Sequence, residues 1–140
     1  MIPVYAQEYD FSACRVLAVD DIPLNLLLVK KMLARFNFKL ETASGGQEAL
    51  DSVVRNKPDL ILLDLMMPGI DGYEVIRRLK SNPETANIRI IILTALTSGE
   101  DVSKGFNMGA NDYIMKPIIM ERLLTSVVTQ LTMSQTDKNQ

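Results

Sequence analysis

Short, uninterrupted apolar runs recur along this chain, and each one stops at a polar residue. Four of these runs, none longer than four residues, end at a residue suited to binding phosphate or a metal, and those residues are Asp20, Asp64, Thr94 and Lys116. Runs this short and this apolar are typical of strands buried on both faces, as in a parallel sheet covered by helices. The carboxyl ends of such strands gather at one edge, where ligands bind. We therefore expect these four side chains to lie together.

Segments with helical spacing of apolar residues alternate with the runs. The predicted strands are 15–20, 38–43, 59–63, 88–93 and 112–116. The predicted helices run from Pro23 to about Phe36, from Ser44 until Pro58, from Tyr73 to about Asn82, from Thr97 to about Met108, and from Ile118 to about Leu131. Thr97 and Glu100 have the spacing of a capping box at the start of the fourth helix. The alternation predicts an α/β fold, with a five-stranded parallel sheet and helices on both faces.

Bulk properties exclude several classes of protein. The 140 residues suffice for one domain with a buried core, and the net charge of −2 indicates no broad surface for nucleic acid. The single cysteine, Cys14, excludes an internal disulfide and favours a reducing, intracellular setting, which we expect to be the cytoplasm. The lack of histidine excludes histidine-based acid–base chemistry on this chain. Neither a secretory signal nor a membrane-length apolar stretch is evident.

The composition changes towards both ends of the chain. Residues 1–13 are predicted to be a leader that packs on the domain or stays mobile. Residues 14–131 are predicted to form the domain, and residues 132–140 a polar tail that frays. Because no DNA-binding, kinase or catalytic extension fits after residue 131, we expect the output of the domain to come from a partner or from a separate part of a larger protein.

The acidic residues at the ends of the first and third strands suggest metal and phosphate chemistry. Asp20 and Asp21 are adjacent, and two such carboxylates repel each other unless a cation lies between them. Mg²⁺ prefers oxygen ligands and takes one or two carboxylates from a protein; helix capping before Pro23 is the alternative. Asp64 after a buried strand is unfavourable unless it is paired or metal-bound. It is also a candidate nucleophile toward phosphorus, with a helix cap or loop anchor as the alternative.

Three further residues complete the candidate site. The flexible ammonium of Lys116 suits a point-charge contact with a phosphoryl oxygen, although most lysines lie at the surface. The hydroxyl of Thr94 is a candidate donor to the same group, and its alternative is an ordinary β-branched strand residue. Tyr113 is either a buried strand aromatic or a movable side chain that responds to the site. The joint placement of these residues predicts a site for a divalent cation and a phosphoryl group.

Four segments of the chain together resemble the receiver domain of two-component response regulators. They are Val-Asp-Asp (19–21), Leu-Leu-Asp-Leu-Met-Met-Pro-Gly-Ile-Asp-Gly-Tyr-Glu (62–74), Leu-Thr-Ala (93–95) and Gly-Ala-Asn-Asp-Tyr-Ile-Met-Lys-Pro (109–117). The resemblance covers residues 14–131, and the stretch from Asp20 to Asn25 further resembles receivers of hybrid histidine kinases. The resemblance to receiver domains implies a flavodoxin-like, doubly wound sheet with strand order 2-1-3-4-5.

The resemblance also implies roles for individual residues. Asp64 would accept a phosphoryl group, as an aspartyl phosphate, from the phosphohistidine of a histidine kinase or histidine phosphotransfer protein. Asp21, Asp64 and the backbone carbonyl of Met66 would bind Mg²⁺ directly, and Asp20 would help through water. The charge on this cation would assist the transfer, which depends mainly on positioning and charge neutralisation.

The resemblance further implies a switch that responds to the phosphoryl group. Thr94 and Lys116 would contact the phosphoryl oxygens, and Tyr113 would turn inward as Thr94 moves toward them. The output face would lie over about residues 97–131 and bind a downstream effector or a fused output domain. Arg122 stands where many DNA-binding regulators have an acidic residue, which weakens a model of homodimerisation through this face.

Two other functions remain open alongside this phosphoacceptor switch. A Mg²⁺-dependent phosphatase with an aspartyl nucleophile typically has a second Asp two residues later, where this chain has Met66. A docking domain that is never phosphorylated would be expected to have lost site residues, and the acidic, bulky Asp21-Ile22-Pro23 argues against a flavin. We predict a switch rather than an enzyme, with at most self-catalysed phosphoryl transfer and autodephosphorylation. We expect no direct contact with nucleic acid or membrane.

Overall fold

Each of the four apolar runs that lead to the candidate site residues forms a strand, and these strands belong to one parallel sheet. The computed structural model describes residues 8–138. Its strands are β1 (Arg15–Val19), β2 (Lys39–Ala43), β3 (Leu60–Leu63), β4 (Arg89–Thr94) and β5 (Asp112–Met115). They lie in the order β2-β1-β3-β4-β5, and every neighbouring pair is parallel. The predicted doubly wound sheet and its strand order are therefore confirmed.

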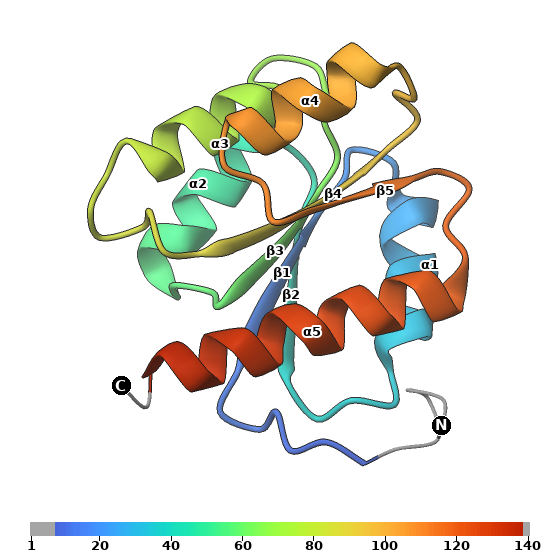
Figure 1. Cartoon of the computed structure of the whole chain (residues 1–140), viewed down its shortest axis with the longest axis vertical. Coiled ribbons are helices and arrows are strands. Elements are labelled where there is room, and N and C mark those ends of the chain that lie inside the picture. The colour runs from blue at the N-terminus through green and yellow to red at the C-terminus, as the bar shows by residue number, and fades with distance from the viewer. Residues whose placement is uncertain (1–7, 139–140) are drawn as a thin grey trace.

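Helices cover both faces of this sheet (Figure 1). They are α1 (Pro23–Leu33), α2 (Gly46–Arg55), α3 (Gly72–Lys80), α4 (Gly99–Asn107) and α5 (Met120–Lys138). Successive residues of a strand point to opposite faces, so β1 contributes to two cores. Val16 packs in the core formed with α1 and α5, whereas Leu17 packs in the core formed with α2 and α3. The prediction of helices on both faces is confirmed.

Local signals set where the helices begin. Pro23 occupies the start of α1, where its missing N–H is not needed. The Asp71 side chain caps α3 by accepting a hydrogen bond from the backbone N–H of Glu74 at 2.9 Å. The predicted capping box of α4 was wrong by one residue, because Ser98 is the N-cap and accepts from the N–H of Asp101 at 3.1 Å. Both candidate pairs have the same spacing, and the sequence pattern alone does not distinguish them.

The C-terminal helix differs most from its prediction. Residues 132–138, predicted to fray, are the last turns of α5, and residues 139–140 lie outside the described range. Arg89 holds these turns by an ion pair with Asp137 at 2.9 Å, and Gln135 Nε2 donates to the carbonyl of Asp10 at 3.0 Å. A polar sequence is therefore helical here because tertiary contacts hold it.

The predicted leader is partly integrated into the domain. Phe11 is 1% exposed and stacks with the ring of Tyr9, with 5.5 Å between the ring centroids. Residues 1–7 of the leader lie outside the described range, and the domain bounds of 14–131 stay a prediction. Within residues 8–138, no helix has the length and apolar character needed to cross a membrane.

Candidate functional site

The carboxyl ends of the strands bring the predicted site residues to one edge of the sheet. Val19 at the end of β1 is in register with Leu63 at the end of β3, so Asp20 and Asp64 follow side by side. At β5, the N–H of Lys116 donates to the carbonyl of Thr94 at 2.8 Å. Residues from four separate strands thus meet because parallel strands all end in the same direction.

Three carboxylates form an acidic cluster at this edge. One carboxylate oxygen each from Asp20, Asp21 and Asp64 lies within 4.8 Å of the others. Asp20 and Asp64 are each only 6% exposed, whereas Asp21 is half-buried. Carboxylates gathered this closely at low exposure need positive charge nearby. Oxygen donors of this kind suit a hard cation such as Mg²⁺.

The ammonium of Lys116 supplies positive charge to two of these carboxylates. Its Nζ lies 2.9 Å from Asp20 Oδ2 and 3.2 Å from Asp64 Oδ2. Burial by itself lowers the pKa of Lys116, but the hydrogen bond to Asp20 and the charges of Asp64 and Asp20 outweigh it and raise that pKa above its usual value. The lysine therefore stays charged and bridges strand ends that are far apart in the sequence.

Backbone and amide donors fix the orientation of the carboxylates. Asp20 Oδ1 accepts from the N–H of Ile22 at 2.9 Å, and Asp20 Oδ2 accepts from Asn25 Nδ2 at 3.1 Å. Asp64 Oδ1 accepts from the N–H of Met66 at 3.2 Å. Asn25 is absent from the sequence-based set of site residues. Its position in the first turn of α1, just after the two aspartates, is the signal that could have identified it.

Thr94 and Tyr113 meet at one residue of the loop between β4 and α4. The N–H of Leu96 donates to Thr94 Oγ1 at 3.4 Å, and the hydroxyl of Tyr113 donates to the carbonyl of Leu96 at 2.8 Å. Thr94 is fully buried and Tyr113 is 6% exposed. Desolvation, with smaller effects from Tyr73 and Asp101, raises the pKa of Tyr113 to about 12. The Tyr113 side chain is thus turned inward. Leu96, like Asn25, is a residue of the site that the sequence-based set does not contain.

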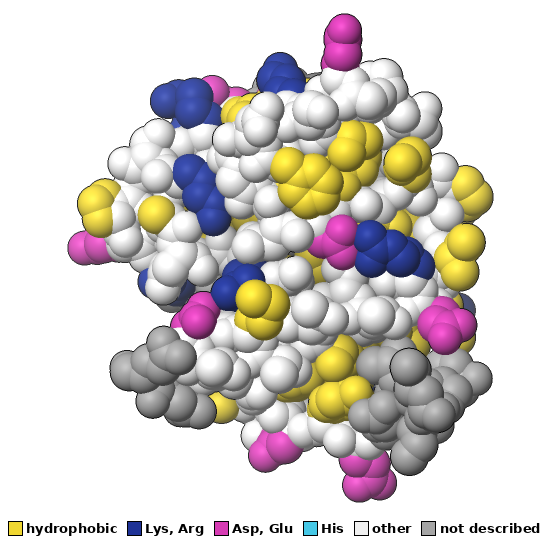
Figure 2. Space-filling model, in the orientation of Figure 1, with side chains coloured by type: hydrophobic (Ala, Val, Ile, Leu, Met, Phe, Trp, Pro, Cys, Tyr) yellow, Lys and Arg dark blue, Asp and Glu magenta, His cyan; other side chains and the backbone are white. Residues whose placement is uncertain are grey.

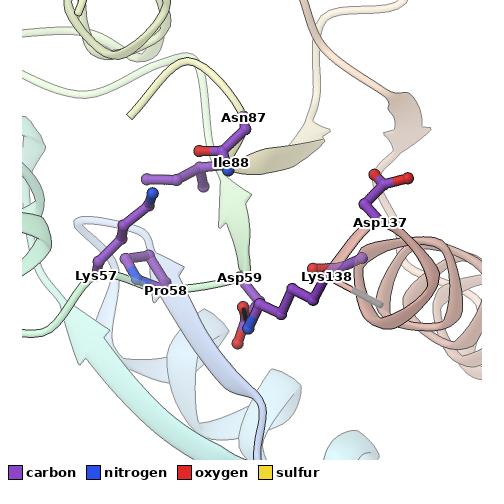
Figure 3. Close-up of a pocket in the computed structure, with 8 residues that line it drawn as sticks. Lys57, Pro58, Asp59, Asn87, Ile88, Asp137 and Lys138 are labelled. Carbon is purple, nitrogen blue, oxygen red and sulfur yellow. Dashed lines mark ion pairs between the residues drawn. The ribbon is translucent and has the colours of Figure 1, made fainter. Parts of the chain in front are cut away.

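A separate hollow lies at the opposite end of the sheet (Figure 3). Its volume is about 310 Å³, and it is lined by Lys57, Pro58, Asp59, Asn87, Ile88, Ser134, Asp137 and Lys138. Lys138 pairs with Asp59, and Asp137 pairs with Arg89, so these charges hold the end of α5. None of the predicted site residues lines this hollow.

Comparisons with known proteins agree on one family. A family model described as response regulator receiver domain matches residues 16–128. Response regulator PleD from Caulobacter vibrioides is 42% identical over 106 residues, which are 76% of this chain and 23% of that protein. This chain therefore spans less than a quarter of the length of PleD.

Solved structures agree with the family model. A signal receiver domain from Vibrio parahaemolyticus has a TM-score of 0.85 at 30% identity, covering 89% of this chain and 95% of that chain. The signal receiver domain of a signal transduction histidine kinase from Syntrophus aciditrophicus has a TM-score of 0.78 at 34% identity, covering 85% of this chain and 90% of that chain.

Proposed function

The chain belongs to the response regulator receiver domain family, and from this membership we propose that it is the phosphoacceptor switch of a two-component phosphorelay with Asp64 as the acceptor. Receiver domains are signalling switches of two-component systems rather than enzymes in their own right. The observation that best supports the proposal is the ammonium of Lys116, which lies within 3.2 Å of Asp64 at the strand ends. A charged lysine beside a buried carboxylate is what an incoming phosphoryl group requires.

The proposed reaction transfers a phosphoryl group to Asp64. A carboxylate oxygen of Asp64 attacks phosphorus, the new O–P bond forms, and the P–N bond to the partner's histidine breaks. The histidine nitrogen keeps the electron pair of that bond. Lys116 then neutralises the phosphoryl oxygens that arrive beside it, and the hydroxyl of Thr94 donates a hydrogen bond to them. Such transfers depend mainly on positioning and on charge stabilisation.

We propose Mg²⁺ as the cation of the acidic cluster. Receiver domains generally bind Mg²⁺ at an acidic pocket, and the three carboxylates within 4.8 Å of one another fit that ion. Asp21, Asp64 and the backbone carbonyl of Met66 would hold it directly, and Asp20 would do so through water. When bound, Mg²⁺ supplies positive charge that offsets the carboxylates and the phosphoryl oxygens.

The family also suggests partners. Receiver domains interact with histidine kinases and output domains, so the proposed phosphodonor is a histidine kinase or histidine phosphotransfer protein. The proposed recipient of the signal is a downstream effector or a fused output domain, acting on the surface over 97–131. Three further points remain predictions. They are self-association through that surface, membership of a hybrid kinase, and a cytoplasmic location.

We also propose that this chain itself contacts neither nucleic acid nor membrane. Figure 2 shows basic and acidic side chains scattered over the face in view, without a continuous basic surface. The net charge of −2 agrees with that distribution. Non-specific binding to nucleic acid depends on neutralising phosphates with clustered Lys and Arg.

Phosphorylation by a small-molecule donor tests this function. We expect acetyl phosphate with Mg²⁺ to add one phosphoryl group, measured by intact-protein mass spectrometry, and EDTA to prevent the addition. Asp64→Asn should abolish it, because the amide cannot act as the nucleophile. Asp59→Asn is the matched control at the other end of β3 and should be labelled like the unmodified protein. Labelling that persists in Asp64→Asn would show that Asp64 is not the acceptor.

A further inference from the structure

The start of α4 is held from two directions. From β5, the hydroxyl of Tyr113 binds the carbonyl of Leu96 in the preceding loop at 2.8 Å. From α3, the hydroxyl of Tyr73 lies 3.4 Å from Asp101 Oδ1, in the first turn of α4. The other oxygen of Asp101 accepts from the hydroxyl of the N-cap Ser98 at 2.6 Å. Tyr73 therefore contacts the capping network of α4 itself.

Tyr73 is also closely connected to the candidate phosphoacceptor. It follows Gly72, and a Cβ at Gly72 would lie 2.4 Å from the backbone oxygen of Asp64 and 2.7 Å from Leu65 Cα. Only a residue without a side chain permits this approach, so the start of α3 packs directly on the backbone of Asp64. We therefore expect a displacement of the Asp64 segment to reach Tyr73 through this backbone contact.

The ring of Tyr73 makes a second contact with α4. Lys104 Nζ lies 3.9 Å from the centroid of the Tyr73 ring, within the range of a cation–π interaction. The next residue, Gly105, packs against the Tyr113 ring, because a Cβ there would lie 3.2 Å from Tyr113 Cδ2. Two adjacent residues of α4 thus contact the two tyrosines: Lys104 contacts Tyr73 of α3, and Gly105 contacts Tyr113 of β5.

We propose that Tyr73 is a positioning residue of the switch. Its hydroxyl and ring hold the start of α4 in the arrangement in which Tyr113 lies buried, and so they favour the state that binds the phosphoryl group. This connects Asp64 with α4 by a route separate from the contacts that Leu96 makes with Thr94 and Tyr113. The inference rests on the proposed phosphoacceptor function and adds a residue to its regulation.

The experiment measures the position of Tyr113 and the affinity for a phosphoryl analogue in the same variants. The chain has four tyrosines, so 3-fluorotyrosine labelling yields a simple ¹⁹F NMR spectrum. The Tyr113 signal is assigned with Tyr113→Phe. The analogue is beryllium trifluoride with Mg²⁺, titrated until saturation. The populations of the inward and outward states of the Tyr113 ring follow from the intensities of two separate ¹⁹F signals. If the two states exchange rapidly, they follow from the chemical shift of the single averaged signal.

Tyr73→Phe removes the hydroxyl and keeps the ring. We expect the inward-to-outward ratio of Tyr113 in the free protein to fall about three- to tenfold, which is the range of a typical intramolecular hydrogen bond. If the inward state is the one that binds, the affinity for beryllium trifluoride must fall by the same factor as the inward fraction. Lys104→Met keeps Tyr73 but removes the cation over its ring. It should also lower the inward-to-outward ratio of Tyr113 and the affinity for beryllium trifluoride.

Tyr9→Phe is the matched control, because it makes the same chemical change where Tyr9 stacks on Phe11, away from α4. Thermal unfolding checks that every variant is folded. The inference is overturned if Tyr73→Phe and Tyr9→Phe have the same inward fraction of Tyr113 and the same affinity for beryllium trifluoride. It is also overturned if Tyr73→Phe raises the inward fraction. An unmodified chain that accepts neither acetyl phosphate nor beryllium trifluoride refutes the proposed function instead, so the two failures are distinguishable.

Discussion

Tyr113 is the residue whose buried position has the clearest consequence for stability. Its side chain is 6% exposed, and its hydroxyl donates to the carbonyl of Leu96. Burial disfavours the phenolate, which raises the pKa of Tyr113 from 10.0 to about 12. A raised pKa in the folded state means that the protonated phenol stabilises the fold. That contribution is fully present below the ordinary pKa and is lost as the pH rises through the folded value.

We therefore expect the stability of the protein to fall between pH 10 and about pH 12. The loss due to Tyr113 should be at most about 3 kcal/mol, since one pKa unit corresponds to about 1.4 kcal/mol. Tyr113→Phe should cost about 1 kcal/mol near neutral pH through the lost hydrogen bond, and the difference from the unmodified protein should shrink or reverse at high pH. Urea unfolding of both proteins at about pH 8 and about pH 11.5 measures this. A constant difference across that range would contradict the prediction.

At the scale of elements, the packing of α4 on β5 depends on a helical glycine. A Cβ at Gly105 would lie 2.8 Å from Ile92 Cδ1 and 3.2 Å from the Tyr113 ring. Gly99, at the start of the same helix, has no atom within 4 Å of such a Cβ. Glycine inside a helix is unfavourable relative to alanine by roughly 1 kcal/mol. Glycine is therefore accommodated at position 105 because Ile92 and the inward Tyr113 occupy the space where a side chain would lie.

Alanine substitutions at these two glycines form a matched pair. Gly105→Ala should be less stable than Gly99→Ala by about 1–3 kcal/mol, because overpacking outweighs the gain in helix propensity. Gly105→Ala should also displace the Tyr113 ring outward, seen in its ¹⁹F signal. Chemical denaturation gives the free energies. Equal stability of the two variants would contradict the prediction, because it would show that the neighbours of Gly105 make room for the methyl group without cost.

At the scale of the whole molecule, residues near the two ends of the described chain contact each other at the edge of the sheet opposite the acidic cluster. Gln135 near the end of α5 binds the carbonyl of Asp10 at 3.0 Å, and the N–H of Phe11 donates to Asn37 Oδ1 at 2.8 Å. Lys138 pairs with Asp59 before β3. The last turns of α5 thus connect the N-terminal segment to the sheet, and from these contacts we propose that the folded unit includes more than residues 14–131.

Truncation after Leu131 tests this larger unit and the predicted domain bounds together. We expect a loss of about 1–2 kcal/mol in the free energy of unfolding, because solvent-exposed ion pairs and one hydrogen bond each contribute modestly. Phosphorylation by acetyl phosphate should be retained, since the acidic cluster lies at the other end of the strands. Urea unfolding and intact mass measure the two effects. A truncated chain as stable as the full one would instead support a domain that ends at residue 131.

Much of the fold could be predicted because its signals are local. The runs at 16–19 and 60–63 are apolar throughout, a pattern that is typical of a strand buried on both faces. Asp64 after the second of these runs marked the candidate site for the same reason, as a carboxylate where a buried strand ends. The N-cap of α4 was misplaced because Thr97 and Ser98 are each followed three residues later by an acidic residue.

The sequence by itself determined the alternation of strands and helices and the polar residue at the end of each strand, because periodicity and burial preference act between near neighbours. Only the tertiary structure decided that Lys116 bridges Asp20 and Asp64, and that Leu96 connects Thr94 with Tyr113. The helical end of α5 is likewise a tertiary result. These contacts join residues from separate elements, and their energies depend on distances that no local pattern contains.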